Sequence, residues 1–309
     1  MLFRKSIRAT MLVVGLVAMA GDVASAELLM WTDQYGCSGP LAMCGAVRTL
    51  DLSLGGSPTT NYYNATEMTN GVVAEPYSGD LYWIESGSVR RMVYRTAATL
   101  ASGSAQSLAI DSAGGKLYWH IFFGVRRANL DGSGLQDIVT GLPGGNIVAL
   151  HLPSAKVYWD VTNTSPRRID RANLDGTGVQ NVMTLASPND IAGIATDPVG
   201  NKLYWSSYSL GKIVSANLDG TSPVDVITSI LPGPIAVDGT AGKIYWINDR
   251  TEIRRANLNG TSPETVVPGL NMASNLSLSP SQPPQSGDFN CDGQVNGLDI
   301  APFVLLLIP

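Results

Sequence analysis

Between residues 27 and 280, apolar residues fall in short strand-length runs that are separated by turn residues. A typical unit starts with IAVD (235–238), passes a Gly-rich turn, and continues with KIYWIND (243–249) and IRRANL (253–258). The last of these leads into Asn-Gly, which favours a β-hairpin because both turn positions accept positive φ. A fourth run, ETVVPGL (264–270), completes the unit, and no helical periodicity interrupts it. Each unit therefore predicts four antiparallel strands.

This unit recurs along the chain. All six tryptophans occupy the same place in it, namely Trp31, Trp83, Trp119, Trp159, Trp205 and Trp246. Their separations of 52, 36, 40, 46 and 41 residues are close to the roughly 40 to 45 residues of a four-stranded propeller blade. Eight residues before each later tryptophan stands a recurring position, filled by Glu75, Asp111, His151, Asp197 and Asp238. The predicted fold is all-β, a six-bladed β-propeller.

The first and last units are incomplete, and together they make one blade. Trp31 lacks the preceding apolar strand, whereas NLSLSP (275–280) is such a strand with no Tyr-Trp strand after it. Placed end to end, the two segments reproduce the order of the internal units. We expect this C-terminal strand to complete the first blade, which closes the ring and removes exposed sheet edges.

These motifs resemble the class B repeats of the low-density lipoprotein receptor, also called YWTD repeats. The resemblance covers residues 27–280 and rests on LYW or IYW, the upstream A-x-D, and ANLDG at 128–132, 172–176 and 216–220. Only Trp31-Thr32-Asp33 keeps the Trp-Thr-Asp sequence in full. The resemblance implies a six-bladed propeller, in agreement with the spacing, and it names no ligand.

The first 26 residues have the three parts of a secretory signal peptide. Arg4, Lys5 and Arg8 precede the apolar run MLVVGLVAMAG (11–21), and the small-residue site ASA ends at Ala26. The alternative is an uncleaved apolar start in a cytoplasmic protein. Cleavage after Ala26 predicts a secreted or cell-surface protein.

Charge and length narrow the classes of partner. The chain has 20 basic and 25 acidic residues, a formal net charge of −5, and the part after residue 26 has 17 and 24, a net charge of −7. We expect no binding to nucleic acid. We also expect no membrane span, since no other apolar run approaches the ~20 residues required. Cys37 and Cys44 are close enough for a local disulfide, which would leave Cys291 unpaired.

A different kind of segment follows the propeller. Residues 281–287 form a Pro, Gln and Ser linker, and DFNCDGQVNGLD (288–299) spaces oxygen donors as an EF-hand calcium loop does. Gly293 falls at the position of the sharp turn. The predicted calcium ligands are Asp288, Asn290, Asp292, Gln294 through its backbone carbonyl, Asn296 and Asp299.

The loop resembles one repeat of a dockerin, whose calcium loops end in Asp at position 12, as Asp299 does here. The resemblance implies bound calcium and attachment to a cohesin-like or cell-surface partner, although dockerins carry two such repeats and this tail (288–309) has one. We expect a short helix over FVLLLI (303–308), with an apolar face that a partner or the propeller covers. The alternative is an acidic tail without fixed structure.

Residues that recur in most blades are expected to solve a packing problem that the blades share. The recurring acids are therefore predicted to form hydrogen bonds near their turns. The recurring arginines, Arg91, Arg127, Arg171 and Arg255, are predicted to pair with carboxylates or to cover tryptophan faces. The only histidines, His120 and His151, belong to different blades, so a satisfied structural role is favoured for each over a metal site or catalytic dyad.

The function hypotheses follow from what the chain contains and lacks. It has no G-x-S-x-G or H-E-x-x-H motif and no Gly-rich phosphate loop. The favoured hypothesis is a non-catalytic binding propeller that presents one face to an extracellular protein or glycan, through positions that differ between blades. The alternative is a propeller hydrolase or lyase of the lactonase kind with an axial metal ion. A third hypothesis is a structural surface-layer component that self-associates.

Overall fold

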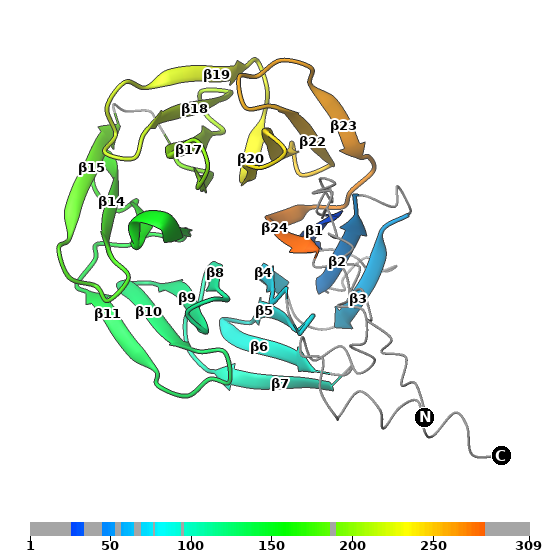
Figure 1. Ribbon diagram of the computed structural model, residues 1–309, viewed down its shortest axis with the longest axis vertical. Coiled ribbons are helices and arrows are strands. Elements are labelled where there is room, and N and C mark those ends of the chain that lie inside the picture. Colours follow the sequence, from blue (N-terminus) through cyan, green and yellow to red (C-terminus); the bar gives the residue numbers. More distant parts are fainter. Residues whose placement is uncertain are drawn as a thin grey trace, which may run out of the picture.

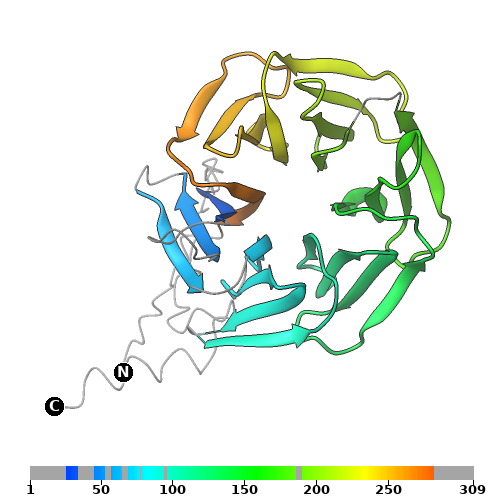
Figure 2. The same cartoon turned by 180° about the vertical axis from the view of Figure 1, so that it is seen from behind.

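The computed structural model describes residues 26–33, 45–52, 57–64, 69–76, 78–93, 96–185 and 190–281. They form six four-stranded antiparallel sheets around one axis (Figure 1), and the view from behind shows the same ring (Figure 2). The predicted all-β, six-bladed propeller is confirmed. The described residues contain no α-helix and one 3-10 turn, Leu152–Ser154. None of them forms a helix long and apolar enough to cross a membrane.

Each sheet is one blade, and its strands follow one another from the axis outward. The first blade contains β24 (Ala273–Ser281), β1 (Ala26–Asp33), β2 (Gly45–Asp51) and β3 (Thr59–Asn64). The second contains β4 (Thr69–Ala74), β5 (Leu81–Glu85), β6 (Ser88–Val93) and β7 (Thr96–Ala101). The third contains β8 (Leu108–Asp111), β9 (Lys116–Ile121), β10 (Gly124–Asn129) and β11 (Gln136–Thr140).

The other three blades have the same order. The fourth contains β12 (Val148–His151), β13 (Lys156–Val161), β14 (Arg167–Asn173) and β15 (Gln180–Leu185). The fifth contains β16 (Gly193–Asp197), β17 (Lys202–Ser207), β18 (Lys212–Asn217) and β19 (Val224–Thr228). The sixth contains β20 (Pro232–Asp238), β21 (Lys243–Asn248), β22 (Glu252–Asn257) and β23 (Glu264–Val267).

The ring closes as the sequence predicts. Strand β24, at the end of the described chain, pairs antiparallel with β1 at its start, and Leu276 lies opposite Trp31. Figures 1 and 2 both show the orange β24 beside the blue β1. The first blade is therefore built from both ends of the described chain, and no inner strand is left without a partner strand.

The Tyr-Trp dipeptide explains how neighbouring blades pack. Successive side chains of a strand point to opposite faces of the sheet, so the two rings of one dipeptide enter different interfaces. Tyr82 packs with Trp119 of the next blade, and Tyr158 packs with Trp205 in the same manner. In the first blade Met30 takes the tyrosine position and packs with Trp83. Six apolar clusters result, one between each pair of adjacent blades.

Polar bonds add to these apolar interfaces. The Tyr158 hydroxyl and the Arg171 guanidinium both donate to the carbonyl oxygen of Leu218 in the next blade, over 3.0 and 2.8 Å. Arg127 donates in the same way to Leu174 O over 2.9 Å. These recurring arginines therefore fasten one blade to the next.

The prediction for the recurring arginines is right in part. Arg91 pairs with the Asp80 carboxylate and Arg255 with the Glu264 carboxylate, whereas Arg127 and Arg171 bond glutamine side chains. The prediction of their stacking partner is wrong. Arg91 lies over the Tyr82 ring, and Trp246 is covered by Arg254. The error has a simple cause: the cross-strand partner of the recurring arginine is the tyrosine of the dipeptide.

The recurring acids behave as predicted. Each accepts hydrogen bonds from backbone N–H groups of the turn that follows: Asp111 from Gly114, Asp197 from Val199, and Asp238 from Thr240 and Ala241, over 2.8 to 2.9 Å. His151 replaces the acid in the fourth blade and bonds the Ser154 hydroxyl through Nδ1 over 2.7 Å. These side chains hold the turns between the first two strands of their blades.

The glycine of the ANLDG turn is required by close approach to the preceding blade. Gly176 has φ +87°, and a Cβ atom there would lie 2.0 Å from the carbonyl oxygen of Ile138. By contrast, Gly242, in the turn after β20, has φ +65°, and a Cβ atom there would have no heavy atom within 4 Å. The two glycines therefore separate the effect of the backbone conformation from the effect of the contact.

Candidate binding site at one end of the propeller axis

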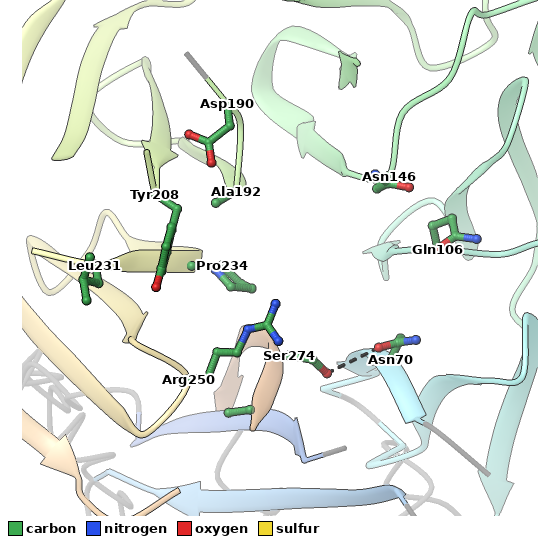
Figure 3. A pocket seen from close by; sticks show the side chains of 12 residues that line it. Asn70, Gln106, Asn146, Asp190, Ala192, Tyr208, Leu231, Pro234, Arg250 and Ser274 are labelled. Atoms are coloured by element: carbon green, nitrogen blue, oxygen red, sulfur yellow. Dashed lines mark hydrogen bonds between the residues drawn. The ribbon is translucent and has the colours of Figure 1, made fainter. Parts of the chain in front are cut away.

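One end of the propeller axis holds a cavity of about 700 Å³, which we call the mouth (Figure 3). It lies where the inner strands begin. Each blade contributes the residue five positions before its recurring acid, with Ser279 in the place of the acid in the first blade. These six residues are Asn70, Gln106, Asn146, Ala192, Gly233 and Ser274.

The two halves of this ring differ chemically. The second, third and fourth blades supply Asn70, Gln106 and Asn146, whose carboxamides each offer both donors and an acceptor. Asn70 accepts a hydrogen bond from the Ser274 hydroxyl over 3.3 Å, which fixes one of them. The fifth and sixth blades supply only Ala192 and Gly233, so this half leaves room for other groups.

That room is lined by residues of the surrounding loops. Because the inner strand starts at the mouth and the Tyr-Trp strand returns to it, the turn after each Tyr-Trp strand lies on this face. The turn after β17 supplies Tyr208, and the turn after β21 supplies Arg250. Figure 3 shows the Arg250 guanidinium pointing into the cavity, across from Asn146 and Gln106. Leu231 adds an apolar edge, with 41% of its surface exposed.

Asp190 is the carboxylate of the mouth, and two serines hold it. Its Oδ1 accepts hydrogen bonds from the Ser207 hydroxyl (2.7 Å), the Ser209 hydroxyl (2.7 Å) and the Ser209 backbone N–H (3.0 Å). Burial acts to raise the pKa of Asp190, but these hydrogen bonds outweigh it and the pKa falls below the usual value. The carboxylate therefore stays charged at neutral pH and orders the turn that carries Tyr208.

Arg250 is placed by an unusual backbone. Both Asp249 and Arg250 have positive φ, +50° and +59°, in a turn that returns directly to β22. The carbonyl of Arg250 accepts a hydrogen bond from the Ala273 N–H over 3.1 Å, which ties the turn to the inner strand of the first blade. Within the described part of the chain the guanidinium forms no salt bridge, so its charge faces the cavity.

The cavity continues inward between the inner strands. A second cavity of about 280 Å³ shares Gln106, Asn146 and Ser274 with the mouth. Aliphatic side chains of five inner strands line it together with Ser107 and Asn275; they are Leu108, Val148, Ile194, Ile235 and Leu276. Most of the exposed lining is polar, so a ligand group that enters from the mouth would continue to meet hydrogen-bonding groups.

Two buried titratable groups support the carboxamide side of the mouth. Asp160 Oδ1 accepts from the N–H groups of Asn146 and Ile147 over 2.7 Å each and so positions Asn146. A Cβ atom on Gly145 would lie 2.6 Å from His120 Nε2 and 3.0 Å from Asp160 Oδ1, so both side chains pack against this glycine and leave no room for a larger residue. Both are fully buried. Burial raises the pKa of Asp160, despite the two backbone bonds that lower it.

His120 differs from its prediction. The sequence favours a satisfied structural role, yet neither ring nitrogen makes a hydrogen bond of ordinary geometry within the described residues. Burial lowers the pKa of His120 to about 4, and the backbone of Ile121 offsets only a small part of this. The imidazole is therefore neutral at neutral pH. The prediction failed because the sequence shows the residue type but not how fully its neighbours enclose it.

The predicted calcium ligands lie outside the described residues; they are Asp288, Asn290, Asp292, Gln294, Asn296 and Asp299. The predicted signal peptide, except for its last residue Ala26, also lies outside them, as do the helix after the calcium loop and all three cysteines. Among the described residues, no three or more His, Cys, Asp or Glu side chains form a group that fits a metal ion. The mouth offers one carboxylate, and its Oδ1 is already occupied. The other oxygen donors at the mouth are the carboxamides of Asn70, Gln106 and Asn146, and amide oxygens are also calcium ligands.

Sequence reasoning missed the residues that line the mouth. Asn70, Gln106, Asn146 and Ser274 share one place in the repeat, five positions before Glu75, Asp111, His151 and Ser279, so aligning the repeats would have found them. Tyr208 and Arg250 do not share a position in the repeat, because turns of different length bring them to the cavity.

Comparisons with known proteins place the fold. No protein-family model matches the chain, and no curated protein matches it in sequence. A chain from the nidogen/laminin complex is 15% identical with a TM-score of 0.70, and the match covers 84% of this chain and 100% of that one. TolB from Acinetobacter baumannii is 9% identical with a TM-score of 0.66, covering 83% of this chain and 67% of that one.

An enzyme is also among the similar structures. A gluconolactonase from Xanthomonas campestris is 18% identical with a TM-score of 0.57, and the match covers 67% of this chain and 78% of that one. Identities this low show a shared propeller fold and carry over neither ligand nor reaction. The expected likeness to YWTD propellers is thus supported for the fold.

Proposed function

We propose that this chain is an extracytoplasmic, non-catalytic binding propeller that holds a polar group of a protein or glycan in its mouth. One observation carries the proposal. The six mouth positions occupy one place in the repeat, yet they are carboxamides in three blades and small residues in the others. The acids and arginines of the same blades repeat because every blade packs alike, so the variation at the mouth favours recognition over packing.

The chemistry of the mouth suits such a ligand. Carboxamides bond hydroxyl and amide groups in either direction, and the Arg250 guanidinium adds a site for a carboxylate. Exposed aromatic rings extend this surface: Phe122 is 53% and Phe123 67% exposed in the turn after β9, on the same face as the mouth. Aromatic and arginine side chains dominate many binding surfaces. The mouth would anchor one group while the surrounding turns contact the rest of the partner.

Arrays of glycans and of peptides, probed with the full chain, test this proposal. Spots bound by the wild type should lose at least about tenfold in signal with Arg250→Gln or with Asn146→Ala, as expected for the loss of one well-placed polar contact. Arg126→Gln is the matched control, since Arg126 pairs with Asp137 on the outer strands. Absence of binding on both arrays, or equal binding by all variants, would refute the proposal.

We also propose that calcium at residues 288–299 attaches the protein to its surroundings. The support is the spacing of the oxygen donors in DFNCDGQVNGLD. Elemental analysis of the full chain after equilibration with calcium should find a stoichiometric ion, and the double substitution Asp288→Ala and Asp292→Ala should remove it. Retention of calcium by the double variant would place the ion elsewhere. Loss of calcium without loss of surface retention would separate metal binding from attachment.

A further inference from the structure

The other end of the axis has the opposite character. A cavity of about 480 Å³ lies there, which we call the far cavity. Each blade contributes the residue one position before its recurring acid, and these are Ala74, Ile110, Leu150, Thr196, Val237 and Leu278. Five of the six are aliphatic, and the Thr196 hydroxyl is already used in a hydrogen bond to Leu150 O (2.6 Å). Among the residues that the structure describes, no charged side chain lines the far cavity.

An apolar hollow of this size in contact with water is unfavourable, because each exposed Å² of apolar surface forgoes roughly 25 cal/mol of burial energy. Leu152 at its rim is 42% exposed. The far cavity therefore favours an apolar occupant without charge. The polar mouth has no such preference, so the two ends of one axis are built for different ligands.

The chain itself supplies a matching segment close by. Strand β24 starts at the mouth, where Ala273 and Ser274 line the cavity, and it ends at the far cavity, which Leu278 and Ser279 line. The chain after Ser281 thus leaves from the wall of the far cavity. Residues 303–308, FVLLLI, have no polar side chain. We propose that this segment docks into the far cavity of its own propeller.

Reach and concentration agree with this assignment. Of the 21 residues between Ser281 and Phe303, nine lie outside the proposed calcium loop, and these nine alone span up to about 30 Å when extended. A tethered segment with this span has an effective concentration on the order of millimolar, which a free peptide or lipid in solution would have to exceed. The tethered segment is therefore the favoured occupant.

Photo-crosslinking in the full chain tests the proposal. With p-benzoylphenylalanine in place of Phe303, irradiation should give crosslinks within one chain, mapped by mass spectrometry to the peptides that carry Leu150, Leu152 or Val237. Mixing isotope-labelled with unlabelled chains distinguishes these from crosslinks between copies. Crosslinks to the mouth face, crosslinks only between copies, or none at all would each overturn the proposal.

A pair of surface substitutions gives the control. Leu152→Glu introduces a charge at the rim of the far cavity and should lower the crosslink yield at least about tenfold, since the carboxylate must be desolvated when the segment docks. Leu231→Glu makes the same change at the mouth, where the side chain is 41% exposed against 42% for Leu152, and should leave the yield unchanged. Equal yields from the two variants would contradict docking at the far cavity.

Discussion

The buried His120 should make the stability of the propeller fall as the pH falls. Above pH 6.5 the imidazole is neutral in both the folded and the unfolded chain. Between pH 6.5 and the folded pKa of about 4, the unfolded chain binds a proton that the folded chain does not. The free energy of unfolding therefore drops across this window by about 3 kcal/mol, of which about 2 kcal/mol appears between about pH 7 and about pH 4.5. Below the folded pKa the contribution is lost in full.

Urea unfolding followed by tryptophan fluorescence measures this loss, because all six tryptophans are buried. His120→Leu breaks no hydrogen bond of the described residues, and it should flatten the pH dependence by about 2 kcal/mol over that range. His151→Leu is the control. Burial also lowers the pKa of His151, but the His151 ring forms a hydrogen bond with the Ser154 hydroxyl. The His151→Leu variant should therefore keep most of the dependence of the unfolding free energy on pH.

The difference in pH slope between the wild type and His120→Leu isolates the imidazole from the other groups. Burial raises the pKa values of Asp160 and Asp33, so their protonation favours the folded chain as the pH falls and opposes the loss in both proteins. Hydrogen bonds lower the pKa values of Asp131, Asp175 and Asp219, but these carboxylates titrate below the window. An unchanged pH slope in His120→Leu would refute the reasoning and would mean that the imidazole is solvated or paired in solution.

Further substitutions test the interfaces between blades by the same urea assay. Gly242→Ala should lower stability by about 1 kcal/mol through its positive φ alone, and Gly176→Ala by about 2 kcal/mol more because the new Cβ meets the preceding blade. Similar losses of stability in the two variants would show that the neighbouring blade shifts to make room for the new Cβ atom. Arg171→Met removes a donor to Leu218 O and should lower stability by about 1 to 2 kcal/mol. Arg126→Met removes an ion pair on the outer strands and should lower it by less than about 1 kcal/mol.

The sequence predicted the parts of this fold that every blade shares. Each Tyr-Trp strand buries one ring on each face, so the tryptophan recurs at all six interfaces and the tyrosine at five, with Met30 at the sixth. The pairing of β24 with β1 followed from two half-units. The turn acids were predicted correctly for the same reason. Repetition marked these residues because six interfaces pose one packing problem.

The candidate site was not predicted because the residues that line it differ from blade to blade. Ala192 and Gly233 contribute to the mouth because their small side chains leave space in the cavity, and a small residue in the sequence does not by itself indicate a binding site. Arg250 reaches the cavity through two successive residues with positive φ, a conformation that Asp-Arg does not suggest in advance. The prediction of a satisfied His120 failed because the sequence cannot show that its ring is enclosed with no hydrogen bond of ordinary geometry among the described residues.

The direction of the inner strands decides which face of the propeller is free. Every inner strand starts at the polar mouth and ends at the apolar far cavity, so the chain after Ser281 departs from the face opposite the mouth. Ala26 pairs with Ser281, which brings the start of β1 to that same face. A protein attached through the segment after β24 would therefore turn its mouth away from the attachment point. Docking of residues 303–308 in the far cavity would shorten this connection and fix the orientation, while a chelator that empties the calcium loop should release the attachment without altering ligand binding at the mouth.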